Sequence, residues 1–392
     1  MQLLSLNIFL CTLGGIWRPV KWTSCSAKLL YHAFSFYIIA SQYLLVLTQI
    51  INLVIIFGDI DEFLFNFLSC LTLIVVCFKT TIALMHQDAI IDLIQTLSQE
   101  PCKPRNADEM AIQTKFDEFI RSCTIKYGLM ATGSITGVTV KSVIDIMKGF
   151  LPYRAWVPYD LSSFVPFMIT SIQQIVTLVF ATIINVGMET LICGMILQTC
   201  AQIEIFEERL QKMINNRRVR SVNQQNSGDP ECSSTAPTNH QEEIISAHIR
   251  HHLIIYEYAK TVNKVFRLVL FVQFLISLII LCMSVYYLSY YITDVEASSM
   301  VVYTICMFIQ IYIYCWSGNE VILKSSSIGN AVYQTDWCML PTSEKKDLLM
   351  ILKRSTIPIK FTSSFLITLS LESFSGILRT SYSAFNVLQQ NS

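Results

Sequence analysis

Charged residues are scarce in this chain. Asp, Glu, Lys and Arg make up 14% of its 392 residues, whereas 53% of the residues are hydrophobic. Soluble domains use about 25% charged residues, so the composition indicates a membrane protein. Acidic and basic residues balance to a net charge of zero, and the sequence has no basic stripe with interleaved aromatic residues. Both observations argue against nucleic-acid binding.

The sequence also lacks the short motifs that mark common catalytic and metal sites. It contains no G-x-S-x-G elbow, no H-E-x-x-H, no P-loop and no G-x-G-x-x-G, and its 13 cysteines include no C-x-x-C pair. The spacing of His248, His251 and His252 would allow a metal site on one helix face. An ordinary solvated helix is the better interpretation, because no cysteine or carboxylate signature is nearby. We therefore expect no enzyme, no metal and no cofactor.

Long apolar runs dominate what is present. In hydrocarbon the backbone must satisfy its own hydrogen bonds, so a run of about 20 apolar residues predicts a spanning helix. Seven runs qualify, and the third is the weakest because it is rich in Gly, Ser and Thr. They cover residues 30–57, 63–85, 123–147, 167–199, 265–292, 299–316 and 361–388. The fold class is therefore an all-α membrane protein with seven transmembrane helices.

Lysine and arginine are distributed unequally between the connections on the two sides. Most lie in the N-terminal segment and after the second, fourth and sixth runs, whereas the opposite connections hold only Lys148 and Arg154. Short cytoplasmic connections are enriched in these residues. We therefore expect a cytoplasmic N-terminus and an extracellular C-terminus. The first 17 residues lack the basic region of a signal peptide and are better read as an interfacial helix.

Helical patterns continue past the fourth run and before the fifth, which predicts a helical cytoplasmic base. The residues between these patterns contain no aromatic residue and indicate a disordered loop at about 217–241. The expected organisation is a cytoplasmic N-terminal segment, transmembrane helices 1–4, cytoplasmic extensions, transmembrane helices 5–6, an anchor segment and a pore-lining helix 7. These cover residues 1–29, 30–200, 201–264, 265–319, 320–360 and 361–392, in that order.

Five charged residues fall inside the apolar runs, where an ionised side chain is costly: Lys79, Glu189, Arg267, Glu372 and Arg379. For Lys79 and Arg267, a side chain that reaches the membrane interface is an equally good explanation. Glu372 and Arg379 lie two helical turns apart on one side of the last helix. We expect them to need polar partners within an assembly.

The last run has a small or hydroxylated stripe opposite a bulky apolar one at 100° per residue. Two interpretations are equally good: a helix-packing seam within one subunit, or a water-lined path. In the second, the path narrows at Val387. The candidate pore-lining residues are Thr380, Ser383, Val387, Gln390 and Asn391. One helix cannot enclose a pore, so the second interpretation requires an oligomer.

Two stretches near the C-terminus resemble a known family. "GNEVILKSSSIGNAVYQTDW" at 318–337 and "LSLESFSGILRTSYSAFNVL" at 369–388 are similar to the region after the sixth span and the closing signature of the insect odorant receptors. The resemblance extends to the layout of the whole chain. It implies a subunit of an odorant-gated, non-selective cation channel that forms a heteromeric tetramer with the co-receptor Orco. It also implies the plasma membrane of olfactory sensory neurons.

The resemblance also implies residue roles. Val387 matches the family's outer hydrophobic constriction, and Gln390 matches a polar pore residue. Asn386, Gln389 and Asn391 depart from the apolar tail of the co-receptor, which favours an odorant-tuning subunit. The family's odorant site lies among the second, third, fourth and sixth spans and suits small volatile ligands. By depth, the candidate pocket residues are Phe65, Ser69, Ser134, Gly137, Lys141, Gln173, Thr177, Tyr303, Cys306 and Met307.

Three alternatives stay open at this point. A gustatory-type ligand-gated channel subunit would have the same layout, but its usual T-Y-x-x-x-x-x-Q-F ending is absent. A G-protein-coupled receptor would need an extracellular N-terminus and motifs that the chain lacks. A transporter is disfavoured because no internal repeat is evident.

Overall fold

The structure is a computed structural model. It describes residues 3–19, 22, 24–55, 60–226, 237–291, 295–334, 337–364 and 367–391. Within these ranges only the backbone is described at 60–62, 65, 217–226, 237–245, 290–291, 295–299, 339, 384 and 387–391. The elements are α1 (Ser5–Leu13), α2 (Cys25–Ile55), α3 (Ile60–Met85), α4 (Gln87–Ser98), α5 (Ala107–Met147), α6 (Phe164–Asn226), α7 (Pro237–Tyr291), α8 (Val295–Tyr333), η1 (Trp337–Met339), α9 (Thr342–Ser355), β1 (Thr362–Ser363), β2 (Ile367–Thr368) and α10 (Leu371–Asn391).

The protein is an all-α membrane protein. In the part of the chain that the structure describes, six helices, α2, α3, α5, α6, α7 and α8, are long and apolar enough to cross a bilayer, and α10 follows as a shorter and more polar helix. The most apolar window of α5 has a mean hydropathy of only 1.2, against 2.8 for α7. This agrees with its expected status as the weakest span.

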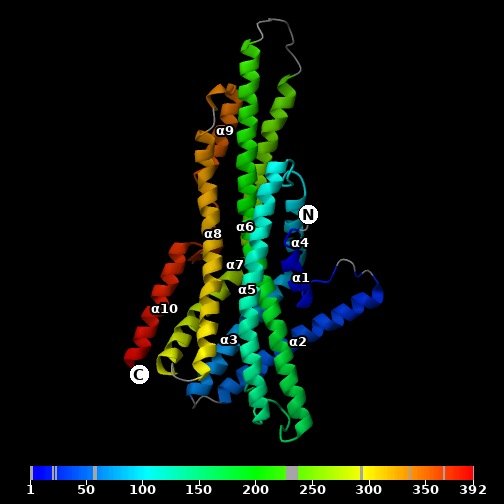
Figure 1. The fold of residues 1–392 in the computed structure, drawn as a ribbon, viewed down its shortest axis with the longest axis vertical. Coiled ribbons are helices and arrows are strands. Elements are labelled where there is room, and N and C mark those ends of the chain that lie inside the picture. The colour runs from blue at the N-terminus through cyan, green and yellow to red at the C-terminus, as the bar shows by residue number, and fades with distance from the viewer. Residues whose placement is uncertain are drawn as a thin grey trace.

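The longest helices run the length of the molecule. Figure 1 shows α6, α7 and α8 continuing from the lower bundle into an upper projection, where α9 packs beside α8. Helix α6 contacts α5, α7 and α8, and its Met188, Leu191 and Ile192 are fully buried. The core therefore follows α6 along both parts of the molecule.

Helix α1 does not lie free at an interface. One face is buried against α5 and α6, where Nδ2 of Asn7 donates to Oγ1 of Thr124 at 3.1 Å and of Thr190 at 2.8 Å. Gly187 makes this approach possible, because a Cβ there would lie 3.2 Å from Leu10. The opening segment is thus an integral part of the bundle, which its apolar residues alone did not indicate.

The last helix begins at Leu371 and not at 361, where the sequence analysis placed its start. Residues 362–363 and 367–368 instead pair as a short antiparallel β-hairpin, beside which the N–H of Leu369 donates to the carbonyl of Phe361 at 2.8 Å. The side chain of Asn263 on α7 accepts from the N–H of Thr362 at 2.8 Å. Apolar composition predicted a helix here, but these pairings satisfy the backbone in another way. Of the disordered loop expected at about 217–241, residues 227–236 lie outside the described residues, whereas 217–226 and 237–241 are helical, at the end of α6 and the start of α7.

A close contact joins α8 to this hairpin. Gly318 on α8 approaches the backbone of Leu369 so closely that a Cβ at Gly318 would lie 2.6 Å from the carbonyl oxygen of Leu369. Nearby, the rings of Tyr312 and Phe374 meet edge to face with centroids 5.6 Å apart. Helix α10 and the hairpin before it are therefore both attached to α8.

Candidate ligand pocket

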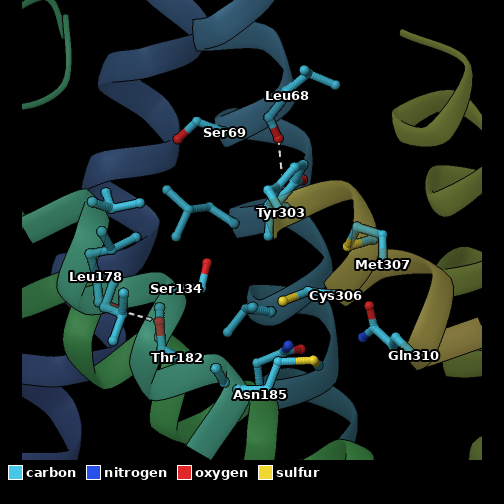
Figure 2. A pocket seen from close by; sticks show the side chains of 18 of the residues that line it. Leu68, Ser69, Ser134, Leu178, Thr182, Asn185, Tyr303, Cys306, Met307 and Gln310 are labelled. Atoms are coloured by element: carbon cyan, nitrogen blue, oxygen red, sulfur yellow. Dashed lines mark hydrogen bonds between the residues drawn. The ribbon is translucent and has the colours of Figure 1, made fainter. Parts of the chain in front are cut away.

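A cavity of about 200 Å³ lies between α3, α5, α6 and α8. Each helix contributes residues spaced three or four apart, so a single face of each helix forms the wall. Figure 2 shows these side chains converging from the four helices. The lining residues are Leu68, Ser69, Thr72, Leu73, Val76, Tyr127, Met130, Ala131, Ser134, Ile135, Val138, Lys141, Tyr153, Leu178, Ala181, Thr182, Asn185, Met300, Tyr303, Cys306, Met307 and Gln310.

The connection between α5 and α6 covers part of this cavity. Tyr153 lines it and is 5% exposed, and its backbone N–H donates to Oε1 of Gln174 at 3.0 Å. The same connection is held to α2 by hydrogen bonds from Asn52 to the carbonyl of Arg154 and from the N–H of Trp156 to the carbonyl of Thr48. A ligand in the cavity would therefore contact a connection that is fixed by hydrogen bonds.

Most of the wall is apolar, and several of its hydroxyl groups are already paired. The hydroxyl groups of Thr72 and Tyr303 lie 2.6 Å apart and join α3 to α8. Oγ1 of Thr182 donates to the carbonyl of Leu178 within α6. A largely apolar wall with few polar groups is typical of sites for small organic molecules.

The lower end of the cavity in Figure 2 is polar. Asn185 and Gln310 lie there, and they contact an ion pair between Lys79 on α3 and Glu189 on α6. Nζ of Lys79 donates to Oδ1 of Asn185 at 2.8 Å, and Nε2 of Gln310 donates to Oε1 of Glu189. Lys79 does not reach an interface, because it is fully buried.

The candidate pocket residues separate into three groups. Six of them line the cavity, namely Ser69, Ser134, Lys141, Tyr303, Cys306 and Met307. Gly137, Gln173 and Thr177 do not line it: Gly137 is exposed, and Oγ1 of Thr177 donates to the carbonyl oxygen of Gln173 within α6. The side chain of Phe65 lies outside the described residues. The candidates chosen by depth thus lie on the helices that form the cavity, but not all of them line it.

Asn185 and Gln310 were not among the candidates. Gln310 lies seven residues after Tyr303 and three after Met307, so helical spacing would have placed it on the same face. Asn185 lies four residues before Glu189, which was noted as a charge within an apolar run. The signal for both was a polar residue in a membrane-spanning stretch.

A second cavity of about 210 Å³ lies nearer the projection, between α5, α6 and α8. It is lined by apolar residues such as Phe119, Ile313 and Trp316, and by Thr124 and Thr190. The hydroxyls of both threonines already accept hydrogen bonds from Asn7. This cavity therefore offers a ligand much less polar recognition than the first.

Helix α10 buries one face and exposes the other. Ile377 and Ser381 are buried in the bundle, whereas Gly376, Thr380 and Ser383 are exposed. Oγ1 of Thr380 donates to the carbonyl of Gly376. Of the candidate pore residues, Val387, Gln390 and Asn391 lie outside the residues whose side chains are described. The small polar stripe is thus not a packing seam within this chain at the two candidate positions that can be examined.

The histidine cluster does not form a metal site. Within the described part of the chain, no group of three His, Cys, Asp or Glu side chains could hold an ion. His251 and His252 are both buried in the part of α7 that precedes its apolar stretch. His251 contacts Arg209 and Gln202 instead, at 3.2 and 3.0 Å.

Comparison with known proteins gives concordant results. Residues 59–382 match the family model described as 7tm Odorant receptor. The chain is 24% identical to odorant receptor 46a, isoform A, of Drosophila melanogaster over 303 residues, 76% of this chain and 74% of the relative. It is 30% identical to odorant receptor 10 of Aedes albopictus over 142 residues, 36% of this chain and 38% of the relative.

The fold is also similar to a solved structure. The olfactory receptor OR5 from Machilis hrabei matches 99% of this chain and 97% of its own, with a TM-score of 0.83 at 15% identity. The structure of that receptor in complex with eugenol matches with a TM-score of 0.81 at 14% identity, over 99% of this chain and 98% of its own.

Proposed function

The chain belongs to the 7tm odorant receptor family, and from this premise we propose that it is the odorant-specific subunit of a ligand-gated, non-selective cation channel. Its relatives are odorant receptors of insects and not enzymes. The proposed assembly is a heteromeric tetramer with the co-receptor Orco. The proposed location is the plasma membrane of olfactory sensory neurons.

The cavity between α3, α5, α6 and α8 is the observation that carries the proposal. Its volume of about 200 Å³ is small compared with sites for drug-sized ligands, and its wall is mostly apolar. Both properties suit a volatile molecule. The Machilis receptor was solved with eugenol, a small aromatic compound, and we transfer only the ligand class to this chain.

Six candidate residues are proposed to contact the odorant. They are Ser69, Ser134, Lys141, Tyr303, Cys306 and Met307, all of which line the cavity. Phe65 precedes Ser69 by about one helical turn and stays part of the proposal. Gly137, Gln173 and Thr177 are left out because they do not line the cavity.

The proposed pore is formed by α10. Its exposed small polar face, with Thr380 and Ser383, supports a water-lined path between subunits, because nothing in the described part of the chain covers it. Val387 is proposed as the hydrophobic constriction, and Gln390 and Asn391 as a polar ring beyond it. The proposed orientation places the N-terminus in the cytoplasm and the C-terminus outside.

Helix α8 is proposed to link the two sites. It carries Tyr303 and Gln310 in the cavity wall and contacts the segment before α10 through Gly318. An odorant can shift the channel only if it binds the open state more tightly than the closed one. We propose that contraction of the cavity around the ligand displaces α8 and α10 and moves Val387 away from the axis.

Recording from cells that express this chain with and without Orco tests the proposal. The panel would contain volatile esters, alcohols, phenols, indoles and ketones. We expect currents that require both subunits, and we expect Val387→Ser to alter basal current or ion permeation. Tyr382→Phe serves as the control, because this change on an exposed side chain of α10 removes only a hydroxyl. Currents that are independent of Orco would favour a gustatory-type channel, and unchanged permeation in Val387→Ser would remove that residue from the pore.

A further inference from the structure

The polar end of the cavity is built on an ion pair that is hidden from the ligand. Lys79 is 0% exposed and Glu189 is 4% exposed, and neither lines the cavity. Each instead holds one amide side chain that does line it. Lys79 binds Asn185, and Glu189 binds Gln310. The pair thus acts on the cavity through these two amides.

The chemistry of the pair decides which way the two amides point. An ammonium group has only donors, so Asn185 must turn its oxygen toward Lys79 and its NH₂ group away from it. A carboxylate has only acceptors, so Gln310 must turn its NH₂ group toward Glu189 and its oxygen away. A flip of the Asn185 amide would place its NH₂ group against the ammonium of Lys79, and a flip of the Gln310 amide would place its oxygen against the carboxylate of Glu189, so both orientations are fixed.

The ligand therefore faces a donor beside an acceptor. The donor is the NH₂ group of Asn185, which lines the cavity. The acceptor is Oε1 of Gln310, which receives no hydrogen bond from any side chain or backbone group in the described part of the chain. Gln310 is 4% exposed, so water has little access to this oxygen when a ligand fills the cavity.

We propose that this end of the cavity recognises a hydroxyl group, so that the preferred ligands are small alcohols and phenols. The hydroxyl oxygen accepts from Asn185, and the hydroxyl proton is donated to Oε1 of Gln310. This rests on the proposed function of the cavity as the odorant site. An ether or ketone of similar shape fills the apolar part equally well but leaves Oε1 of Gln310 without a donor. A site built to bind a hydroxyl group discriminates strongly against the analogue that lacks it.

Matched ligand pairs test this inference in the full chain expressed with Orco. The probes are para-cresol against its methyl ether, and hexanol against its methyl ether. We expect the hydroxyl compound of each pair to be about tenfold to a hundredfold more potent, as half-maximal concentration. Equal potency, or preference for the ethers, overturns the inference and leaves the proposed function standing. No evoked current from these probes or from the wider panel overturns the proposed function, and the inference with it.

Two variants assign the discrimination to its residue. Gln310→Met removes the acceptor at similar volume, so we expect the preference for hydroxyl compounds to fall toward unity while the ether response persists. Gln173→Met changes a glutamine of α6 that does not line the cavity, and it should leave the ratio unchanged. A Gln310→Met channel that keeps the native ratio overturns the assignment. If that variant does not reach the surface, the ratio in the native protein still decides the proposal.

Discussion

Two buried ion pairs occupy different parts of the molecule. Lys79 and Glu189 join α3 to α6 beside the cavity, and Arg209 and Glu109 join α6 to α5 in the projection. The side chains of all four residues are at most 7% exposed. What distinguishes the two pairs is the set of groups that take up their remaining hydrogen-bonding capacity.

The pair in the projection, here called the closed pair, is hydrogen-bonded mainly to backbone groups. Arg209 donates to the carbonyl oxygens of Pro101 and Lys103 at 2.5 and 2.8 Å, and the N–H of Arg105 donates to Oε2 of Glu109 at 2.8 Å. These contacts fix the connection between α4 and α5 against α6. The pair therefore serves the packing of this region, and none of these partners lines the cavity.

The pair beside the cavity, here called the open pair, is hydrogen-bonded to side-chain amides that line the cavity. Its partners are the amides of Asn185 and Gln310, each of which keeps one polar end directed away from the pair. Burying charge is costly in either place, and replacing such a pair by apolar groups is often neutral or stabilising. The contrast teaches that the same kind of buried pair fixes a backbone in one region and sets the polarity of a binding surface in the other.

Breaking the closed pair should have the largest effect. Glu109→Ala leaves the Arg209 guanidinium, which cannot lose its proton, buried without its carboxylate. We expect a loss of about 3–5 kcal/mol in the free energy of unfolding, measured as thermal stability of the detergent-solubilised protein. Glu100→Ala is the matched control, because its ion pair with Arg105 is exposed and should be worth at most about 1 kcal/mol. Similar losses in both variants would refute a special role for the closed pair.

Breaking the open pair should cost less and reveal its second role. In Lys79→Met the Glu189 carboxylate keeps the hydrogen bond from Gln310, so we expect a loss of about 2–3 kcal/mol in the free energy of unfolding. The double variant Lys79→Met/Glu189→Gln carries no buried charge and should regain most of this stability. Its amides no longer have a fixed orientation, so the preference for hydroxyl ligands should fall. A double variant as unstable as the single one, or with native preference, would contradict this account.

A shift to mildly acidic pH should produce the smallest of the three losses of stability, and it should act near the closed pair. Burial and the charge of Arg209 lower the pKa of His251 far below its usual value, and burial and Arg354 lower that of His252 to about 4. Both imidazoles are neutral in the folded protein, so the stability they contribute is complete above about pH 6.5 and is lost as the pH falls below it. We expect a loss of about 1–2 kcal/mol at about pH 6.

The measurement is thermal unfolding across this pH range. His252→Gln should reduce the pH dependence, whereas the same change at the exposed His86 should not. An unchanged pH dependence in His252→Gln would show that the histidine is not responsible. Because His251 contacts Arg209, the effect is expected in the projection and not at the cavity.

Much of the architecture could be predicted from the sequence. Length and hydropathy located the six long spans, because the membrane imposes a simple rule on backbone hydrogen bonding. The start of the last helix could not be located in the same way. The sequence at 361–370 is apolar enough to continue a span, but Thr362 pairs with Asn263, which is distant in the sequence, and with Thr368 across the hairpin. Local composition carries no record of either.

The cavity shows the same division. Tyr303, Cys306 and Met307 were selected by their depth on α8. They line the cavity together because residues three or four positions apart share a helix face. The pairing of Lys79 with Glu189 was not predictable, because the two side chains are 110 positions apart in the sequence and meet only in the fold. For Lys79 the sequence left the choice between a buried partner and the interface open, and only the packing of α3 on α6 decided it.

The contact between Gly318 and Leu369 has a consequence for how movement passes through the molecule. Where two side chains touch, a change of rotamer can absorb a small displacement. Here the glycine faces the Cβ, carbonyl carbon and carbonyl oxygen of Leu369, and none of these atoms moves when a side chain changes its rotamer. The joint between α8 and the hairpin is therefore stiff. A shift of α8 at this point either moves the base of α10 by a similar amount or is resisted as a whole.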